Sequence, residues 1–429
     1  MRLSVTVPLV TLGSVSLFAV ALAAPSSGAA AGAAACSHAQ PSASSTEATR
    51  LAQPTSASDA RPLGESLGDG ISAAIRSLEP VDATGRPTSG LPYGLSQGVV
   101  GVVGSATTGY EVVVDAAKVD TKKYQSAMSR NLPTAGKSMV KVEHSCRSAK
   151  AIADAWNTVG KRSWSSDASR TTFAADLDPT SENILVEYDG ATTSPASLAG
   201  LRKLSGVQLV AGSLARTTRL SDTPKGGHWG GARITSAAKN CSAGFSVVRR
   251  SNGQRGSVTA GHCGAPGTVW KSGANYYGTT TVRTNYPDYD QSLVTGSSYG
   301  AKIWTDGPGD TANTRTVTGG GDPGVGTVVC QSGSFSTSVC SLTVRSTSAK
   351  YCDSDGCTTY VIRATRGGLI AIIGGDSGGP VYTRRGSSSA TVRGIVFAGA
   401  GCAASRCTTL YAERYNSIAG HLGVTALTG

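Results

Sequence analysis

The chain contains little charge, few aromatic side chains and only one long apolar stretch. Of its 429 residues, 15% are charged and 6% aromatic, whereas 55 are Gly. Low charge together with 39% hydrophobic residues excludes a disordered polyelectrolyte and provides enough apolar surface for a packed core. The glycines follow no three-residue period, which excludes a collagen-like chain. Because each Gly inside a helix costs about 1 kcal/mol relative to Ala, the composition also disfavours a helical bundle.

The only long apolar run lies at the N-terminus, from Val5 to Ala24. It follows a single positive charge, Arg2, and ends in Ala21-Leu22-Ala23, which fits a signal-peptidase cleavage site. We interpret residues 1–24 as a secretory signal peptide and expect an extracellular protein. A membrane anchor and a lipoprotein site at Cys36 are the alternatives. No later segment has 18 uninterrupted apolar residues, so we expect no membrane partner after cleavage.

The ten cysteines form an even number, as a disulfide framework in an oxidising compartment requires. Cys36 and Cys146 stand apart from eight others in the C-terminal half: Cys241, Cys263, Cys330, Cys340, Cys352, Cys357, Cys402 and Cys407. The spacings lack C-x-x-C and the chain has only 5 His, which argues against a structural zinc site. No metal or organic cofactor is expected, because no ligand cluster or phosphate-binding motif is visible.

Composition divides the chain before residue 222 into two segments. Residues 25–94 are rich in small residues and predict a flexible leader with little core, apart from a short helix at Gly70–Leu78. Residues 95–221 predict a small α+β unit. Its expected strands are Val99–Val103, Tyr110–Val114 and Ile184–Tyr188, and its expected helices are Thr121–Leu132, Ala149–Val159 and Ser197–Leu204.

Residues 222–429 have a different sequence pattern, in which short β-branched stretches alternate with clusters of Gly, Ser, Asn and Pro. The stretches include Phe245–Val248, Thr280–Val282, Gly326–Val329 and Val392–Val396, and a final helix is expected at Tyr411–Leu422. Many short strands with turn signals predict an antiparallel sandwich or barrel, and this length suits two barrels. The chain is therefore expected to be mainly β.

Basic residues concentrate in this last segment. It carries 19 Lys and Arg against 10 Asp and Glu, which is +9 of the total charge of +12. The arginines are scattered singly, apart from Arg249-Arg250 and Arg384-Arg385. We interpret the charge as a solvated basic surface and expect no nucleic-acid partner.

Three motifs in the same segment carry the chemistry. They are Thr259-Ala260-Gly261-His262-Cys263, Asp290-Gln291-Ser292-Leu293-Val294 and Gly374-Gly375-Asp376-Ser377-Gly378-Gly379-Pro380. In this order they resemble the His, Asp and Ser motifs of the trypsin/chymotrypsin-like serine peptidase superfamily. The resemblance implies two antiparallel six-stranded β-barrels followed by a C-terminal helix.

Each motif residue has a chemical reason. A serine hydroxyl such as that of Ser377 needs an adjacent base, which His262 supplies. A buried carboxylate orients the imidazole, and Asp290 is preferred because an apolar strand follows it; Asp288 is the competitor. The amides of Gly375 and Ser377 are expected to form an oxyanion hole.

The motif Gly375-Asp376-Ser377-Gly378-Gly379 also matches the G-x-S-x-G turn of α/β-hydrolases. That fold requires the chain order Ser, acid, His, which Glu413 and His421 could formally supply. Only 52 residues follow Ser377, too few for the remaining βα units, and the segment is rich in strands. Both observations disfavour this alternative.

The likeness is greatest to the bacterial secreted branch, the streptogrisins and α-lytic protease, and covers residues 222–429. It implies disulfides Cys241–Cys263 and Cys330–Cys340. It also implies that the preceding residues, 95–221 above all, act as a pro-region that assists folding and inhibits the enzyme. Cys352–Cys357 and Cys402–Cys407 are the expected remaining pairs, with cross-pairings left open. A monomer is expected.

Three departures from the branch stand out. Gln331 occupies the place of an Arg that pairs with the acid before the nucleophile, which leaves the partner of Asp376 open. Phe397 replaces a Ser that helps to hold the triad carboxylate. Ile373 replaces a Cys that is common just before the nucleophile motif. Arg233-Ile234 looks superficially like a trypsinogen activation site, but Ile234 lies only seven residues before Cys241, so we expect no trypsinogen-like insertion and place maturation between Ala215 and Gly231.

Apolar residues occupy the places that line the primary specificity pocket: Ala371, Ile372, Phe397, Ala398 and Gly399. Trypsin-like members have an Asp where Ala371 stands, so we expect cleavage after uncharged, apolar side chains. The leading hypothesis is a secreted serine endopeptidase that acts on protein or peptide substrates through an acyl-enzyme. The alternative is a catalytically silent trypsin-like binding protein.

Overall fold

The computed structural model describes residues 37–54, 61–82, 85–166, 168, 171–189, 193–194, 196–212, 227–305, 310, 312–403 and 406–429. The expected signal peptide, residues 1–24, lies outside these ranges, as does most of the expected maturation segment. Within them, no helix has both the length and the apolar character needed to cross a membrane.

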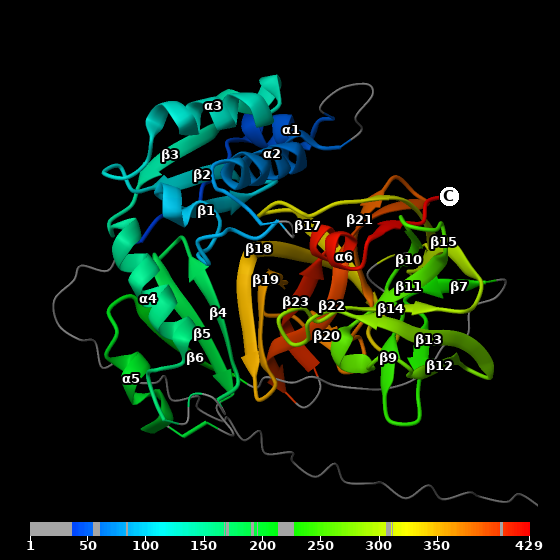
Figure 1. Ribbon diagram of the computed structural model, residues 1–429. Coiled ribbons are helices and arrows are strands. Elements are labelled where there is room, and N and C mark those ends of the chain that lie inside the picture. Colours follow the sequence, from blue (N-terminus) through cyan, green and yellow to red (C-terminus); the bar gives the residue numbers. More distant parts are fainter. Residues whose placement is uncertain are drawn as a thin grey trace, which may run out of the picture. The chain divides into compact units, whose positions relative to one another are not determined.

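The first part of the described chain is a small α/β layer (Figure 1). It contains α1 (Ser45–Ala52), α2 (Leu63–Ser77), η1 (Leu95–Gln97), β1 (Val99–Ser105), β2 (Gly109–Val114), α3 (Thr121–Asn131), η2 (Thr134–Met139) and β3 (Val140–His144). The strands run in the order β1-β2-β3, with β1–β2 antiparallel and β2–β3 parallel. Apolar residues of α2 pack against β1 and β2 in one core, for example Leu67 and Ile71 against Val112.

The expectation of a leader with little core is therefore wrong. The predicted helix at Gly70–Leu78 is longer and spans Leu63–Ser77, and ten of its residues are buried. Two of its glycines lie so close to the β1–β2 hairpin that a larger side chain would not fit. A Cβ on Gly64 would lie 1.9 Å from the carbonyl oxygen of Ala106, and one on Gly68 would lie 2.5 Å from the hydroxyl of Tyr110. Small residues that favour disorder in isolation here permit close helix-to-sheet packing.

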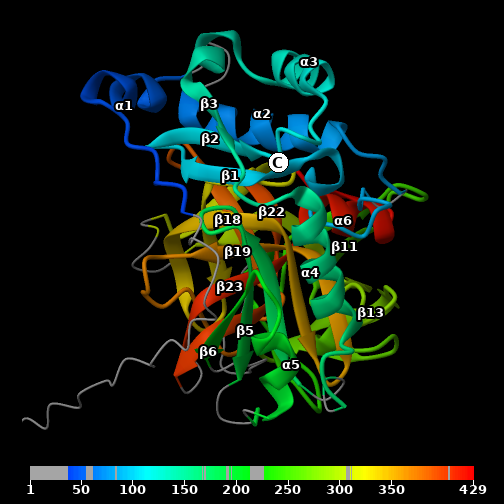
Figure 2. The ribbon, with the colours of Figure 1, turned by 90° about the vertical axis from the view of Figure 1, so that its left-hand side faces the viewer.

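A second layer follows, in which helix α4 covers a three-strand unit (Figure 2). The elements are α4 (Ala149–Lys161), β4 (Phe173–Asp178), β5 (Asn183–Asp189), η4 (Ala196–Leu198), α5 (Ala199–Arg202) and β6 (Val207–Gly212). β4 pairs with β5 antiparallel, and β5 pairs with β6 in parallel. Trp156 and Ile152 of α4 share one core with Phe173 and Val186 of the strands. The strands β3, β4 and β6 had not been predicted.

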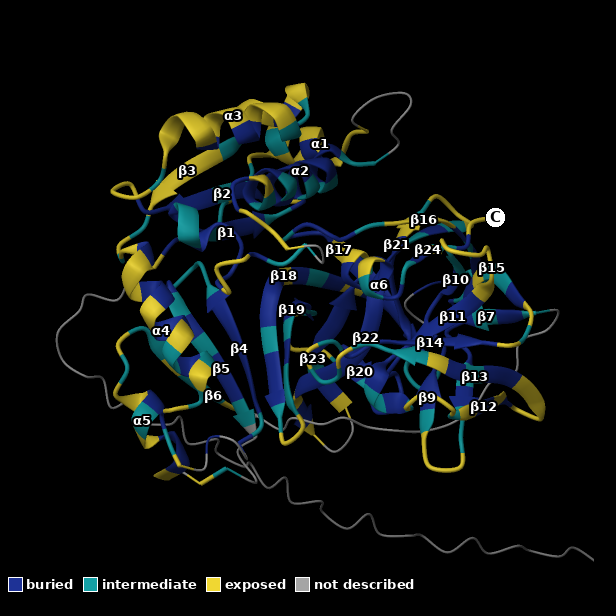
Figure 3. Cartoon of the chain, in the orientation of Figure 1, coloured by how far each residue is buried: buried dark blue, intermediate teal, exposed yellow. Residues whose placement is uncertain are grey.

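The remaining residues form two larger sheets that Figure 3 shows as mostly buried. The first has the order β24-β10-β11-β14-β13-β12-β8-β9. Its strands are β8 (Arg233–Thr235), β9 (Asn240–Ser242), β10 (Ser246–Arg249), β11 (Arg255–Thr259), β12 (Val269–Ser272), β13 (Asn275–Arg283), β14 (Ser292–Thr295) and β24 (Val424–Ala426). All pairings described in this sheet are antiparallel.

The second large sheet has the order β20-β23-β19-β18-β17-β21-β22-β16-β15-β7. Its strands are β7 (His228–Gly230), β15 (Tyr299–Trp304), β16 (Thr314–Gly320), β17 (Val328–Gly333), β18 (Thr337–Asp353), β19 (Gly356–Thr365), β20 (Ile372–Ile373), β21 (Pro380–Arg385), β22 (Ser389–Ala403) and β23 (Arg406–Arg414). β15–β7 and β16–β22 are parallel, so this sheet is not wholly antiparallel as expected. The mainly β fold class is confirmed, whereas two six-stranded barrels stay a prediction.

Strand β4 also joins this second sheet, because it pairs antiparallel with the distal end of β18 (Figure 1). The register places Ala175 opposite Lys350 and Phe173 opposite Cys352. Residues 173–178 and 337–353 therefore belong to one continuous hydrogen-bonded sheet.

The C-terminal helix begins later than expected. It is α6, Tyr415–His421, whereas Tyr411–Arg414 still belong to β23. Tyr411 pairs with Arg363 of β19 and with Ala398 of β22. Pairing on both sides with distant strands overrides the local helical pattern.

The described disulfides are the expected pairs. Cys241–Cys263 joins β9 to the segment after β11, and three others cross strand pairs: Cys330–Cys340, Cys352–Cys357 and Cys402–Cys407. Cys146 is also disulfide-bonded.

Candidate active site

Strand pairing brings the His and Asp motifs together. His262 lies in η5 (Gly261–Cys263), directly after β11, and Asp290 lies two residues before β14. β11 and β14 are antiparallel neighbours with Thr259 opposite Ser292. The end of one strand therefore meets the start of the next, which places His262 beside Asp290.

The two side chains form a buried pair. Nδ1 of His262 lies 2.9 Å from Oδ2 and 3.1 Å from Oδ1 of Asp290, and the backbone N–H of His262 donates to Oδ1 at 2.7 Å. Asp290 is fully buried, and the imidazole is 9% exposed. Because an ionised carboxylate can only accept, Nδ1 carries the proton and Nε2 keeps its lone pair.

Asp288, the alternative acid, has other contacts. Its carboxylate accepts a hydrogen bond from the side-chain amide of Asn285 at 2.7 Å, and its backbone carbonyl accepts one from Arg86 at 2.8 Å. The geometry therefore favours Asp290 as the partner of His262.

Ser377 lies in the turn between β20 and β21. It is close to the Cys241–Cys263 disulfide, which also lies beside His262. Its carbonyl accepts from the N–H of Ser242 at 2.7 Å. The Sγ atom of Cys263 lies 3.9 Å from that carbonyl oxygen and 3.9 Å from Nε2 of His262. Within the described ranges, the Ser377 hydroxyl makes no hydrogen bond with His262; such bonds commonly form only when substrate is bound.

The turn that carries Ser377 presents two unpaired amides. Among the described residues, the buried N–H groups of Gly375 and Ser377 donate to no acceptor. Gly375 has φ +99° and its carbonyl accepts from the Ser242 hydroxyl at 2.7 Å. Gly378 has φ +92°, and a Cβ there would lie 2.1 Å from the Ser242 carbonyl oxygen. Both amides are therefore available to donate hydrogen bonds to an oxygen of a bound molecule.

Comparison with known proteins shows which proteins the chain is similar to. No family model matches the chain. Serine protease 1 of Streptomyces fradiae is 30% identical over 240 residues, which are 55% of this chain and 61% of that protein. Streptogrisin-C of Streptomyces griseus is 29% identical over 266 residues, 59% of this chain and 54% of that protein. Over these residues the chain is similar to streptogrisin-type serine proteases.

The chain spans little more than half the length of these curated relatives. Among solved structures, protease A of Thermobifida fusca is 29% identical with a TM-score of 0.39, and the match covers 47% of this chain and 98% of that one.

The partner of Asp376, left open by the departure from the streptogrisin-type Arg, is a set of amides. Its carboxylate accepts from the backbone of Ile373 at 2.7 Å, Ser336 at 3.0 Å and Phe335 at 3.2 Å, and from the Gln331 side chain at 3.4 Å. Asp376 is fully buried, and this burial raises its pKa, although the amides oppose the rise. Gln331 thus substitutes for Arg as a neutral donor.

The five residues expected to line the streptogrisin-type specificity pocket are all buried. Phe397 and Ala398 belong to one core, in which the Phe397 ring meets that of Tyr351 edge-on at 5.7 Å. Ala371 and Ile372 belong to another core. At Gly399 a Cβ would lie 2.6 Å from Cδ1 of Ile372, so these two residues touch. Their role in substrate binding stays a prediction.

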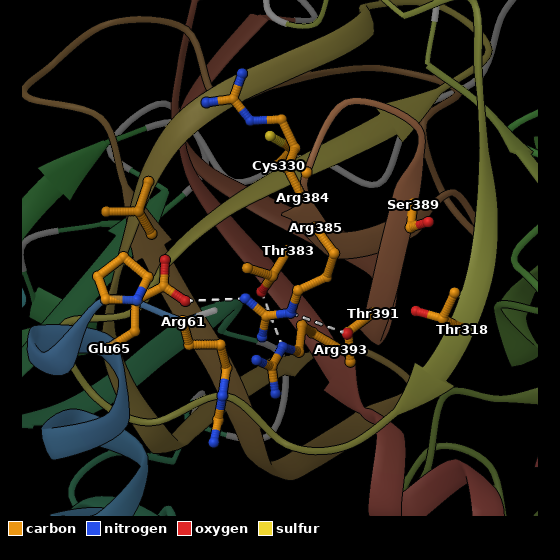
Figure 4. Close-up of a pocket in the computed structure, with 13 residues that line it drawn as sticks. Arg61, Glu65, Thr318, Cys330, Thr383, Arg384, Arg385, Ser389, Thr391 and Arg393 are labelled. Carbon is orange, nitrogen blue, oxygen red and sulfur yellow. Dashed lines mark hydrogen bonds and ion pairs between the residues drawn. The ribbon is translucent and has the colours of Figure 1, made fainter. Parts of the chain in front are cut away.

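A cavity of about 820 Å³ lies elsewhere, between the region of α2 and strands β21 and β22 (Figure 4). Four arginines line it, Arg61, Arg384, Arg385 and Arg393, and two of them pair with carboxylates of α2: Arg385 with Glu65 at 3.1 Å and Arg393 with Asp69 at 3.8 Å. His262, Asp290 and Ser377 do not line it. We therefore interpret it as part of the contact between residues 61–77 and the streptogrisin-type segment.

Proposed function

We propose that the chain is a serine endopeptidase in which Ser377 is the nucleophile, His262 the general base and Asp290 the orienting acid. The supporting observation is the buried His262–Asp290 pair, which leaves Nε2 with its lone pair; the Sγ atom of Cys263 lies 3.9 Å from both this Nε2 and the Ser377 carbonyl oxygen. The Ser377 hydroxyl transfers its proton to Nε2 as Oγ attacks the substrate carbonyl. The amides of Gly375 and Ser377 hold the developing oxyanion. His262 then protonates the leaving amine, and water releases the acyl group by the reverse steps.

A serine-directed fluorophosphonate tests this proposal. The mature wild type is expected to be labelled once, and Ser377→Ala to lose both the label and peptide hydrolysis, by about 10⁶-fold in kcat. Mass spectrometry of the labelled peptide locates the site. A wild type that is neither labelled nor active would refute the enzyme and leave the silent binding protein.

We further propose a preference for uncharged, apolar side chains at the residue before the cleaved bond. Ala371 and Ile372 carry no charge to pair with Lys or Arg. Matched peptide substrates that differ only at this residue are expected to be cleaved at least about tenfold faster with Phe or Leu than with Arg, because burying an unpaired charge is costly. Faster cleavage after Arg would contradict the proposal.

The N-terminal part is proposed to be the pro-region of a secreted precursor and to bind the peptidase segment. Three contacts support this: the β4–β18 pairing, the Arg385–Glu65 ion pair, and Glu187 of β5. Glu187 lies 3.2 Å from Arg363 and accepts a hydrogen bond from the hydroxyl of Tyr411. Backbone pairing and ion pairs therefore both join the segments, as a folding aid and inhibitor requires.

The stability of the precursor is expected to depend on pH through Asp176 of β4. Burial raises the pKa of Asp176 to about 7 from 3.8, although Arg363 nearby lowers it. The folded precursor thus keeps a proton that the unfolded chain releases, so the contribution to stability is present below pH 4 and is lost as the pH rises through 7. Urea unfolding of Ser377→Ala precursors at several pH values should show a decline of up to about 1.4 kcal/mol per pH unit, relative to the same precursor with Asp176→Asn. Parallel pH curves would contradict it.

A further inference from the structure

Glu413, considered above only as the acid of an α/β-hydrolase, lies directly behind Asp290. It is the penultimate residue of β23 and is 0% exposed. Its Oε1 accepts a hydrogen bond from the backbone N–H of Asp290 at 2.7 Å. Asp290 is therefore held at both ends, with its carboxylate on His262 and its amide on Glu413.

Asp290 lacks one hydrogen-bond donor that the family resemblance leads us to expect beside its carboxylate. Phe397 stands where a serine hydroxyl would contact the triad carboxylate, and its ring packs against Tyr351 instead. Phe397 offers no hydrogen bond, so main-chain contacts carry more of the task of fixing Asp290. The Glu413 bond is one of these, and it is short.

The Glu413 carboxyl is itself fixed by helix α6. Its Oε2 accepts from the Ser417 hydroxyl at 3.4 Å, and the same hydroxyl accepts from the Gln291 side chain at 2.9 Å. Nδ1 of His421 donates to the Ser417 carbonyl at 2.8 Å. Gln291 adjoins Asp290 in sequence, so the network returns to the segment that it supports.

The charged neighbours of Glu413 come from several elements. Arg414 follows it on β23 and pairs with Asp322 at 2.9 Å, and Arg86 approaches from the N-terminal part. Burial raises the pKa of Glu413 to about 7; the hydrogen bond from the Asp290 amide and the two arginines oppose this rise, whereas the charge of Asp290 adds to it. Burial lowers the pKa of His421, which keeps this ring neutral near pH 7. Glu413 can therefore change its charge in the range where a serine peptidase works.

We propose that Glu413 is a positioning residue for the triad, which fixes the main chain of Asp290 and, when ionised, adds a second negative charge behind the His262–Asp290 pair. This inference rests on the proposed serine peptidase function. The charge stabilises the imidazolium that forms on His262 as the proton leaves Ser377. The hydrogen bond keeps the Asp290 carboxylate within reach of Nδ1.

Two substitutions separate the charge from the hydrogen bond. Glu413→Gln keeps an oxygen that can accept from Asp290 and removes the charge. Its kcat is expected to stay within about fivefold of wild type, while the acidic limb of kcat/KM against pH moves down by about half a unit, because a nearby anion favours imidazolium. Glu413→Leu leaves the buried Asp290 amide unpaired and is expected to lower kcat about 10- to 100-fold with KM within about twofold.

A matched control is Asp310→Asn, which removes the charge of another buried carboxyl, paired with Arg315 at 2.6 Å. Rates are divided by the concentration of Ser377 that reacts with the fluorophosphonate, so that misfolded protein does not lower the kcat values. The inference is overturned if Glu413→Gln keeps the wild-type pH profile, or if Asp310→Asn shifts it equally; Glu413→Leu with wild-type kcat would also overturn it. If Glu413→Leu fails to fold, the profile of Glu413→Gln still decides. Failure of the wild type to label would instead overturn the proposed function.

Discussion

Asp290→Asn is expected to lower kcat by about 10⁴ with little change in KM. Asp290 accepts from Nδ1 of His262 at 2.9 Å, which keeps the lone pair on Nε2. An asparagine amide can donate to Nδ1 and thereby favours the opposite tautomer, with the proton on Nε2. That imidazole cannot take the Ser377 proton. Burst and steady-state kinetics with one chromogenic peptide measure the effect.

Asp288→Asn is the matched control, because it makes the same chemical change two residues away. The Asp288 carboxylate contacts Asn285 rather than His262. We expect its kcat to stay within about twofold of wild type, as for a surface substitution outside the site. The opposite ranking of the two variants would contradict the assignment of Asp290.

The second large effect concerns folding. Residues 222–429 refolded alone are expected to recover at least about tenfold less activity than with residues 25–221 added in trans, because β-rich domains with distant pairings fold slowly. The pairings are distant indeed: Val247 of β10 lies opposite Ala426 of β24. β4 pairs with the distal end of β18 on the side opposite β19. Equal recovery with and without the added segment would refute the folding role.

An ion-pair swap provides the control for this experiment. Glu65 and Arg385 lie 3.1 Å apart and are 19% and 22% exposed. Glu65→Arg in the added segment or Arg385→Glu in the peptidase segment should each weaken the stimulation, because like charges then meet. The two together should restore most of it. Weakening that persists in the double variant would show that the contact acts in some other way.

The active-site motifs were predictable because each is local and its chemistry restricts the residues that can occupy it. The His262–Asp290 contact follows from a strand that begins just after Asp290. Glu413 was not assigned to this site from sequence, because a lone glutamate near the C-terminus carries no motif of its own. Only the pairing of β23 with its neighbours brings it behind Asp290.

The N-terminal part was predicted less well, for two physical reasons. The glycines of α2 look like breakers, yet Gly64 and Gly68 are where the sheet approaches most closely. The segment Phe173–Asp178 alternates weakly, and besides its neighbour β5 its strand pairs with a partner about 175 residues away along the chain, where Ala175 lies opposite Lys350. Neither contact can be derived from local propensity.

The β4–β18 pairing has one more consequence, for the peptidase segment once it stands alone. Without β4, the main-chain groups at Lys350–Cys352 become an open sheet edge, the kind of surface on which chains aggregate. In the full chain Lys350 is partly buried, with its Nζ 5.2 Å from the centre of the Trp156 ring, and this burial lowers its pKa to about 8. If residues 25–221 are removed, Lys350 becomes solvent-exposed and regains its full charge at one end of that edge. Because a charged lysine on an edge strand disfavours pairing with another chain, we expect Lys350 to limit aggregation at this edge.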